Sequence, residues 1–227
     1  MKKILRRLAV TASFLVVMSL FVVLTYLINH KERYELTREL VSPDGQVTRA
    51  YFSPRDDLRS LCISLIDAES QSIQFAIYTF TDKQIAQALI RAARRGVSIE
   101  GIVDRSYGQM RSSQVASLAN AQIPLWVYQT AADENQAGLM HNKFWLFERS
   151  LEGKSLVWTG SYNFTRRASE RNEENAVILS NPDIVKRFKD YCIQLKEKSL
   201  QISGKVARFS DEKNDRTRTL QKNECIV

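Results

Sequence analysis

The chain has 227 residues, the length of one domain with additions at its ends, and a formal net charge of +8 at pH 7. Nothing repeats at a fixed period and no long Gly/Ser-rich or Pro-rich linker occurs, which excludes a repeat architecture and a string of domains. The positive charge indicates an anionic partner, either nucleic acid, an acidic lipid surface or a phosphate ester, and does not choose among them.

The N-terminus predicts a membrane anchor over residues 1–30. The basic stretch MKKILRR is followed at 8–29 by 22 uncharged residues, long enough to span a bilayer core of about 30 Å. No A-x-A cleavage site follows, which favours an uncleaved signal anchor over a cleaved signal peptide. The basic residues belong on the cytoplasmic side, so the rest of the chain is expected on the periplasmic or extracellular side, or secreted if the anchor is cleaved.

The cysteines and histidines argue against a zinc site. Cys62 and Cys192 fall on apolar faces of predicted helices, where small buried side chains are usual. No C-x-x-C occurs, and the two histidines, His30 and His141, are far apart in the sequence. We therefore expect no zinc site.

The first predicted elements follow a polar, charged stalk at residues 31–47. An edge strand at 47–52 ends at Ser53-Pro54, and Asp56-Asp57 open a helix with apolar residues at helical spacing. The next elements are a strand in SIQFAIYTF (72–80), a helix in DKQIAQALIRAARRG (82–96) and a strand in VSIEGIVD (97–104). This alternation predicts an α/β sandwich around a largely buried sheet.

The second half of the chain is richer in strands. A short helix at 113–120 and a strand at 123–128 precede three strand-like stretches, GLMHNKFWLFE (138–148), SLVWTGS (155–161) and ENAVILS (174–180). Asn181-Pro182-Asp183 then predicts the start of a helix. Residues 199–227 are charged and nearly free of aromatic residues, so we expect a disordered tail after a folded domain at 48–198.

The pair His141 and Lys143 is the first candidate for chemistry. Side chains two apart on a strand share a face, so these two and Trp145 should point the same way, opposite to Phe144 and Leu146. An imidazole and an ammonium on one face suit an anion lying over them. The alternative is a strand end at which both side chains simply face solvent.

A second group of candidates follows the strand at 155–161. Ser161 and Asn163 can donate hydrogen bonds to phosphate oxygens, and Gly160 allows the backbone to approach a ligand closely. Glu174 starts the next strand, where its carboxylate can accept the Nδ1 proton of a histidine. The alternatives are an ordinary turn at 160–163 and a solvated charge at 174.

Together these stretches resemble the phospholipase D superfamily. The resemblance is to members with a single His-Lys-Asp motif per chain, which include small bacterial nucleases and phospholipases and the mitochondrial enzyme. His141-x-Lys143, Gly160-Ser161-x-Asn163 and Glu174 fall in the family's order, and the similarity covers about residues 48–198. It implies the family's α/β/α sandwich with a mixed central sheet, here preceded by one transmembrane helix. The motif acid, normally Asp, is Glu148, at a position that is more structural than chemical in the family.

The resemblance implies a metal-independent phosphodiester exchange in two steps, with no metal and no other cofactor. His141 attacks phosphorus and forms a phosphohistidine, while a second histidine protonates the leaving oxygen and then activates water. Lys143 and Asn163 hold the non-bridging oxygens, with Ser161 as a lesser contact. Glu174 orients the histidine ring.

Two histidines are needed, and His30 lies at the membrane end of the stalk. The second histidine is therefore expected to be His141 of another chain, in a two-fold homodimer with one composite site.

The substrate stays open between two classes. The predicted anchor slightly favours the head-group ester of a membrane phospholipid, whereas the net charge of +8 suits DNA or RNA. A non-catalytic phosphate-binding protein is a third possibility, suggested only by Glu148.

Overall fold

The computed structural model describes residues 14–25, 46–108, 110–129 and 138–202. Residues 14–25 are helical, and the remainder of the predicted anchor and nearly all of the stalk at 31–47 lie outside the described residues, as does the tail from residue 203. Among the described stretches, no helix has the length and apolar character needed to cross a membrane.

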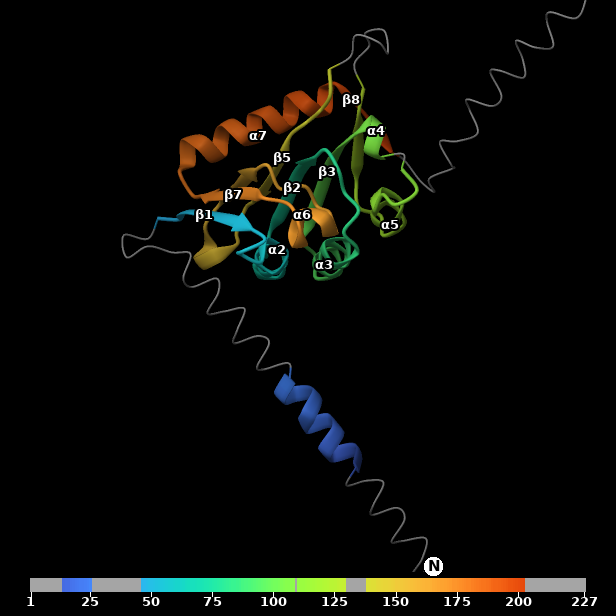
Figure 1. The fold of residues 1–227 in the computed structure, drawn as a ribbon, viewed down its shortest axis with the longest axis vertical. Coiled ribbons are helices and arrows are strands. Elements are labelled where there is room, and N and C mark those ends of the chain that lie inside the picture. Colours follow the sequence, from blue (N-terminus) through green and yellow to red (C-terminus); the bar gives the residue numbers. More distant parts are fainter. Residues whose placement is uncertain (1–13, 26–45, 109, 130–137, 203–227) are drawn as a thin grey trace, which may run out of the picture. The chain divides into compact units, whose positions relative to one another are not determined.

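The part of the chain described from residue 46 onward folds around one mixed sheet (Figure 1). Its eight strands are β1 (Thr48–Ser53), β2 (Ser72–Ile77), β3 (Ser98–Asp104), β4 (Leu125–Tyr128), β5 (Lys143–Phe147), β6 (Leu156–Gly160), β7 (Glu174–Leu179) and β8 (Ser199–Ile202). They lie in the order β1-β7-β6-β5-β2-β3-β4-β8. The strands β2, β3 and β4 are parallel, and all other neighbours are antiparallel, so the predicted mixed sheet is confirmed.

Helices cover both faces of this sheet (Figure 1). They are α2 (Leu58–Ala68), α3 (Lys83–Arg94), α4 (Arg105–Gly108), α5 (Val115–Asn120), α6 (Arg166–Glu170) and α7 (Pro182–Glu197), with a 3-10 turn η1 at Leu151–Gly153. The long helix α7 crosses one face, and α2, α3 and α5 pack on the other. As predicted, α7 starts at the cap Asn181, whose side-chain oxygen accepts from the backbone N–H groups of Asp183 and Ile184.

Alternate residues of the strands contribute to the hydrophobic packing on the two faces of the sheet. Phe144 and Leu146 of β5 face α7 and pack with Val185 and Leu195. On the opposite face Trp145 stacks on Phe164, with ring centroids 4.3 Å apart. The division of β5 into two faces predicted from its sequence is therefore confirmed.

The two described cysteines are buried and free, as their positions predicted. Burial raises the pKa of the Cys192 thiol to about 11 and that of Cys62 well above its ordinary value, so neither thiol ionises near neutral pH.

The folded domain extends past the predicted boundary at residue 198. Residues 199–202 form strand β8, which pairs antiparallel with β4 in the register Leu125↔Ile202. The four residues SLQI are too few to predict a strand on their own. It becomes a strand because the open edge of β4 supplies unpaired backbone groups where the chain leaves α7.

Candidate active site

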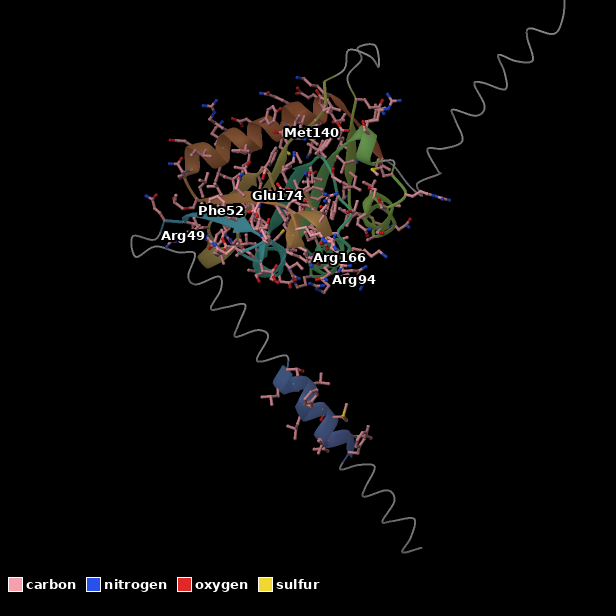
Figure 2. All side chains as sticks on the ribbon, in the orientation of Figure 1. Arg49, Phe52, Arg94, Met140, Arg166 and Glu174 are labelled. Atoms are coloured by element: carbon pink, nitrogen blue, oxygen red, sulfur yellow. The ribbon has the colours of Figure 1, made fainter. Side chains whose placement is uncertain are left out.

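The strand registers bring the predicted site residues to one end of four neighbouring strands. Ile77 at the end of β2 pairs with Lys143 at the start of β5. Gly160 at the end of β6 pairs with Ala176 near the start of β7. Since β5 and β6 are also antiparallel, the two motifs lie at the same end of these strands. Figure 2 labels two residues at this end of the strands, Glu174 of β7 and Met140 before β5.

His141 does not lie within a strand, which corrects the expectation for residues 138–148. Strand β5 begins at Lys143, and His141 is exposed just before it. The reason lies in the backbone bonds of this segment. The N–H of Met140 donates at 3.0 Å to the side chain of Asp104 instead of to a neighbouring strand. The N–H of Tyr78 still donates to the Asn142 carbonyl at 3.0 Å, so pairing with the β2 side stops one residue after His141.

Lys143 is buried, with 7% of its surface exposed, directly beside the exposed imidazole of His141. Its Nζ lies 3.2 Å from His141 Nδ1 and donates to the His141 carbonyl oxygen at 2.7 Å. Burial lowers the pKa of Lys143, and the negative charge of Glu174 partly offsets that effect. The ammonium is thus held close to the imidazole in a partly desolvated position, where an anion would be bound strongly.

Gly160 is required by a close approach between β6 and β7. A Cβ atom at this position would lie 2.2 Å from the backbone oxygen of Asn175, closer than real Cβ atoms come. The following N–H of Ser161 donates to the same oxygen at 3.1 Å. The glycine therefore allows the turn to fold tightly against the first residues of β7.

Glu174 is fixed by two donors from its own chain. The Ser161 hydroxyl donates to Oε2 at 2.6 Å, and the Asn172 amide donates to Oε1 at 2.8 Å. Ser161 in turn accepts the N–H of Asn175 at 3.0 Å. Two of the candidate residues, Ser161 and Glu174, are therefore brought into direct contact. The role of Asn172 was missed, because a single amide in a charged turn gives no signal by itself.

Asn163 is also held in a defined orientation. Its side-chain oxygen accepts the backbone N–H of Thr79 at 3.2 Å. The amide NH₂ then remains as the donor that a phosphate oxygen can use. Thr79 is the second residue after β2, so the stretch that follows this strand contacts both motifs of the site.

Tyr78 and Asp104 are two further site residues that the sequence did not reveal. The Tyr78 ring lies 4.4 Å from the His141 ring and 5.2 Å from Lys143 Nζ, measured to ring centroids. Asp104 is buried at the end of β3 and accepts from Ser106 at 2.9 Å as well as from Met140. Both residues lie within predicted strands, Tyr78 one residue past the end of β2 and Asp104 at the end of β3, and a polar or aromatic residue near a strand end is the only signal that the sequence offers.

Glu148 lies at the opposite end of β5 from Lys143, about 16 Å away by strand geometry. Its carboxylate pairs with Lys189 of α7 and accepts from the Ser155 hydroxyl at 3.2 Å. The neighbouring Arg149 N–H donates to the buried carboxylate of Glu69 at 2.9 Å. These contacts anchor the far end of the strand, and none of them reaches the site.

The site can bind and polarise an anion with an exposed imidazole next to it. It combines a desolvated ammonium, an oriented amide and a carboxylate held by two donors. In the part of the chain that is described, no three His, Cys, Asp or Glu side chains are grouped so that they could hold a metal ion.

A family model agrees with the resemblance seen in the sequence. The model described as "Cardiolipin synthase, PLD-like domain" matches residues 62–196. The phospholipase D of Rickettsia conorii is 30% identical over 161 residues, which cover 71% of this chain and 72% of the relative. The mitochondrial cardiolipin hydrolase of Danio rerio is 30% identical over 128 residues. That match covers 56% of this chain and 52% of the relative, so the chain spans about half of that protein.

Solved structures show the same fold. Nuc from Salmonella typhimurium, a phospholipase D family member, superposes with a TM-score of 0.61 at 28% identity, covering 70% of this chain and 99% of Nuc. NucT from Helicobacter pylori gives 0.60 at 25% identity, covering 69% and 99%. The fold, the family model and the curated relatives agree with one another, and the chain belongs to the phospholipase D superfamily as one of its phosphodiesterases.

Proposed function

We propose that this chain is a metal-independent phosphodiester hydrolase that acts through a phosphohistidine on His141, with phospholipid head-group esters as its substrates. The observation that carries the proposal is the partly desolvated Lys143 ammonium, whose Nζ lies 3.2 Å from His141 Nδ1. The side chain of Asn163 lies at the same end of the strands. A phosphodiester is an anion whose charge grows on its non-bridging oxygens during attack. Lys143 and Asn163 are the donors for those oxygens, and Ser161 is a weaker contact.

The proposed first step forms a bond between phosphorus and the His141 ring, and breaks the ester bond. Because Nδ1 lies beside Lys143, we assign the attack to Nε2. A second histidine gives its proton to the leaving oxygen. In the second step that histidine takes a proton from water, the resulting hydroxide attacks phosphorus, and the phosphorus–nitrogen bond breaks to release the phosphate product.

Attack by Nε2 requires the ring proton to be on Nδ1, and an ammonium cannot accept that proton. A carboxylate is needed there, and we assign this role to Glu174. Within one chain its oxygens accept from Ser161 and Asn172, and each carboxylate oxygen has capacity for a further donor. We therefore place the orienting contact in the assembled dimer, where His141 of a second chain also supplies the acid and base.

The dimer makes a quantitative prediction for mixed assemblies. When wild-type and His141→Ala chains are co-expressed in equal amounts, about one quarter of the dimers carry two intact histidines. We expect the specific activity of the mixture to fall with the square of the wild-type fraction. A linear fall, or a diluted monomer that keeps full activity, would contradict the composite site. Sedimentation at the assay concentration gives the oligomeric state independently.

The lipid substrate is supported by the curated relatives, whose names are phospholipase D and cardiolipin hydrolase. The predicted anchor at residues 1–30 also supports it, since it would hold the exported domain beside a membrane. A nuclease is the second candidate. The net charge of +8 favours it, and the names Nuc and NucT belong to the structural neighbours just described. The hydrolase relatives leave the non-catalytic alternative without support.

One parallel assay separates the two substrates. The full-length protein and its His141→Ala variant, both in chelator, are given phosphatidylcholine or cardiolipin vesicles and single-stranded DNA. We expect head-group release that needs His141, and activity that survives the chelator. Cleavage of DNA alone, falling steeply as salt rises from 50 to about 200 mM, would instead establish the nuclease. If the chelator abolished all turnover, the metal-independent mechanism would be wrong.

A further inference from the structure

We propose that Tyr78 is a positioning residue of this active site, whose ring holds the His141 imidazole and the Lys143 ammonium in their working arrangement. The inference rests on the proposed function and adds a residue to it. Neither the His-x-Lys pair nor the Gly-Ser-x-Asn turn contains this tyrosine. It comes from the stretch that follows β2, far from both in the sequence.

The backbone of Tyr78 is tied directly to the catalytic segment. Its N–H donates to the carbonyl of Asn142, the residue between His141 and Lys143, at 3.0 Å. Ile77, just before it, pairs with Lys143 in the sheet. The position of the ring relative to His141 and Lys143 is thus set by backbone pairing rather than by side-chain packing alone.

The Tyr78 ring packs against the His141 imidazole. The ring centroids lie 4.4 Å apart with planes at 62°, an edge-to-face arrangement. His141 is exposed, so its side chain would otherwise sample several rotamers in water. Attack on phosphorus requires one orientation of the ring, and a misplacement of about 1 Å can cost about 10²-fold in rate.

The same ring attracts the lysine without neutralising it. Lys143 Nζ lies 5.2 Å from the Tyr78 ring centroid, within the range of a cation–π contact. Burial disfavours the charged form of this lysine, and the negative face of an aromatic ring favours it. A carboxylate at this distance would bind the ammonium more strongly and compete with the phosphate. An aromatic ring holds the cation in place and leaves its charge for the substrate.

The residue after Tyr78 contributes to the second motif. The Thr79 N–H donates to the Asn163 side-chain oxygen at 3.2 Å, and its carbonyl accepts the Phe164 N–H at 3.1 Å. A shift of the Tyr78 backbone would therefore move both the His141 segment and the Asn163 amide. For this reason the test must change the ring and leave the backbone as it is.

The matched variants are Tyr78→Phe, which keeps the ring, and Tyr78→Leu, which removes it. In the full-length protein we expect Tyr78→Phe to retain kcat within about threefold. We expect Tyr78→Leu to lower kcat by about 10²-fold while KM changes by less than about threefold. Equal losses in both variants would assign the effect to the hydroxyl group and overturn the proposal, and so would a Tyr78→Leu enzyme with wild-type kcat.

A spectroscopic readout keeps the test independent of activity. The chain has two histidines, so the ring signals of His141 can be assigned by comparison with a His30→Gln variant. We expect the His141 ring protons to show a nuclear Overhauser effect to the Tyr78 ring and a ring-current shift that Tyr78→Phe keeps and Tyr78→Leu loses. Wild-type spectra without either signal would overturn the placement of Tyr78, even if Tyr78→Leu failed to fold. Absence of hydrolysis by the wild type would contradict the proposed function and leave these signals as the test of the ring.

Discussion

The His141→Ala variant is expected to lose phosphodiesterase activity by about 10⁴-fold or more in kcat, because under the proposed mechanism it removes both the nucleophile and, in the proposed dimer, the acid and base. The side chain is exposed, so the thermal midpoint should stay within about 2 °C of the wild type. Steady-state hydrolysis of the better substrate, followed beside a thermal melt, measures both quantities.

The other histidine provides the matched control. His30→Ala should retain wild-type turnover, and substrate labelled with ³²P should leave label on wild-type and His30→Ala chains when the reaction is quenched without acid. No label should remain on His141→Ala. Equal inactivation by the two substitutions, or labelling that persists without His141, would show that another group is the nucleophile.

Lys143→Met is expected to lower kcat/KM by about 10² to 10³-fold without lowering stability. The loss of activity follows from the proposed role of Lys143 as a preorganised donor to the non-bridging oxygens. The stability follows from the pKa of Lys143, which burial lowers in the folded state. The folded protein binds this proton less tightly than the unfolded chain does. The charged lysine therefore weakens folding at neutral pH, and that penalty decreases as the pH rises above the folded-state pKa and vanishes above the pKa of the unfolded chain.

Melting the two proteins across a pH series tests this prediction. At neutral pH the midpoint of Lys143→Met should equal or exceed that of the wild type, and the difference should shrink at alkaline pH. Lys189→Met is the control, because this lysine pairs with Glu148 at the far end of β5 and should leave kcat/KM unchanged. A Lys143→Met protein that turned over normally but melted earlier would reverse both expectations.

The face of β5 on which Lys143 lies was predictable, because the residue belongs to a short, regular stretch. Alternation along β5 placed Lys143 and Trp145 opposite Phe144 and Leu146, since strand geometry depends only on spacing. The start of the strand was not predictable in the same way. The alternation of buried and exposed side chains continues through Met140, which is buried, and His141, which is exposed. The backbone nevertheless leaves the sheet there, because the N–H of Met140 donates to the side chain of Asp104.

The residues that were missed depend on contacts between segments far apart in the chain. Tyr78 reaches His141 only because β2 and β5 pair in one register, and a shift of one residue would turn its ring to the other face of the sheet. Strand β8 likewise depends on the open edge of β4, where Ile202 pairs with Leu125, 77 residues earlier. Such pairings follow from the packing of the whole domain, and no local pattern encodes them.

The connection between β5 and β6, which contains η1, turns the chain at the end of the sheet opposite the site. Its length therefore sets neither the spacing nor the orientation of the reacting groups. Over evolution, insertions at this turn would be tolerated more readily than any at 160–163, where the backbone of Gly160 closely approaches Asn175. In the laboratory the same turn is a suitable place to attach a fluorophore or an affinity label for following the enzyme on its substrate.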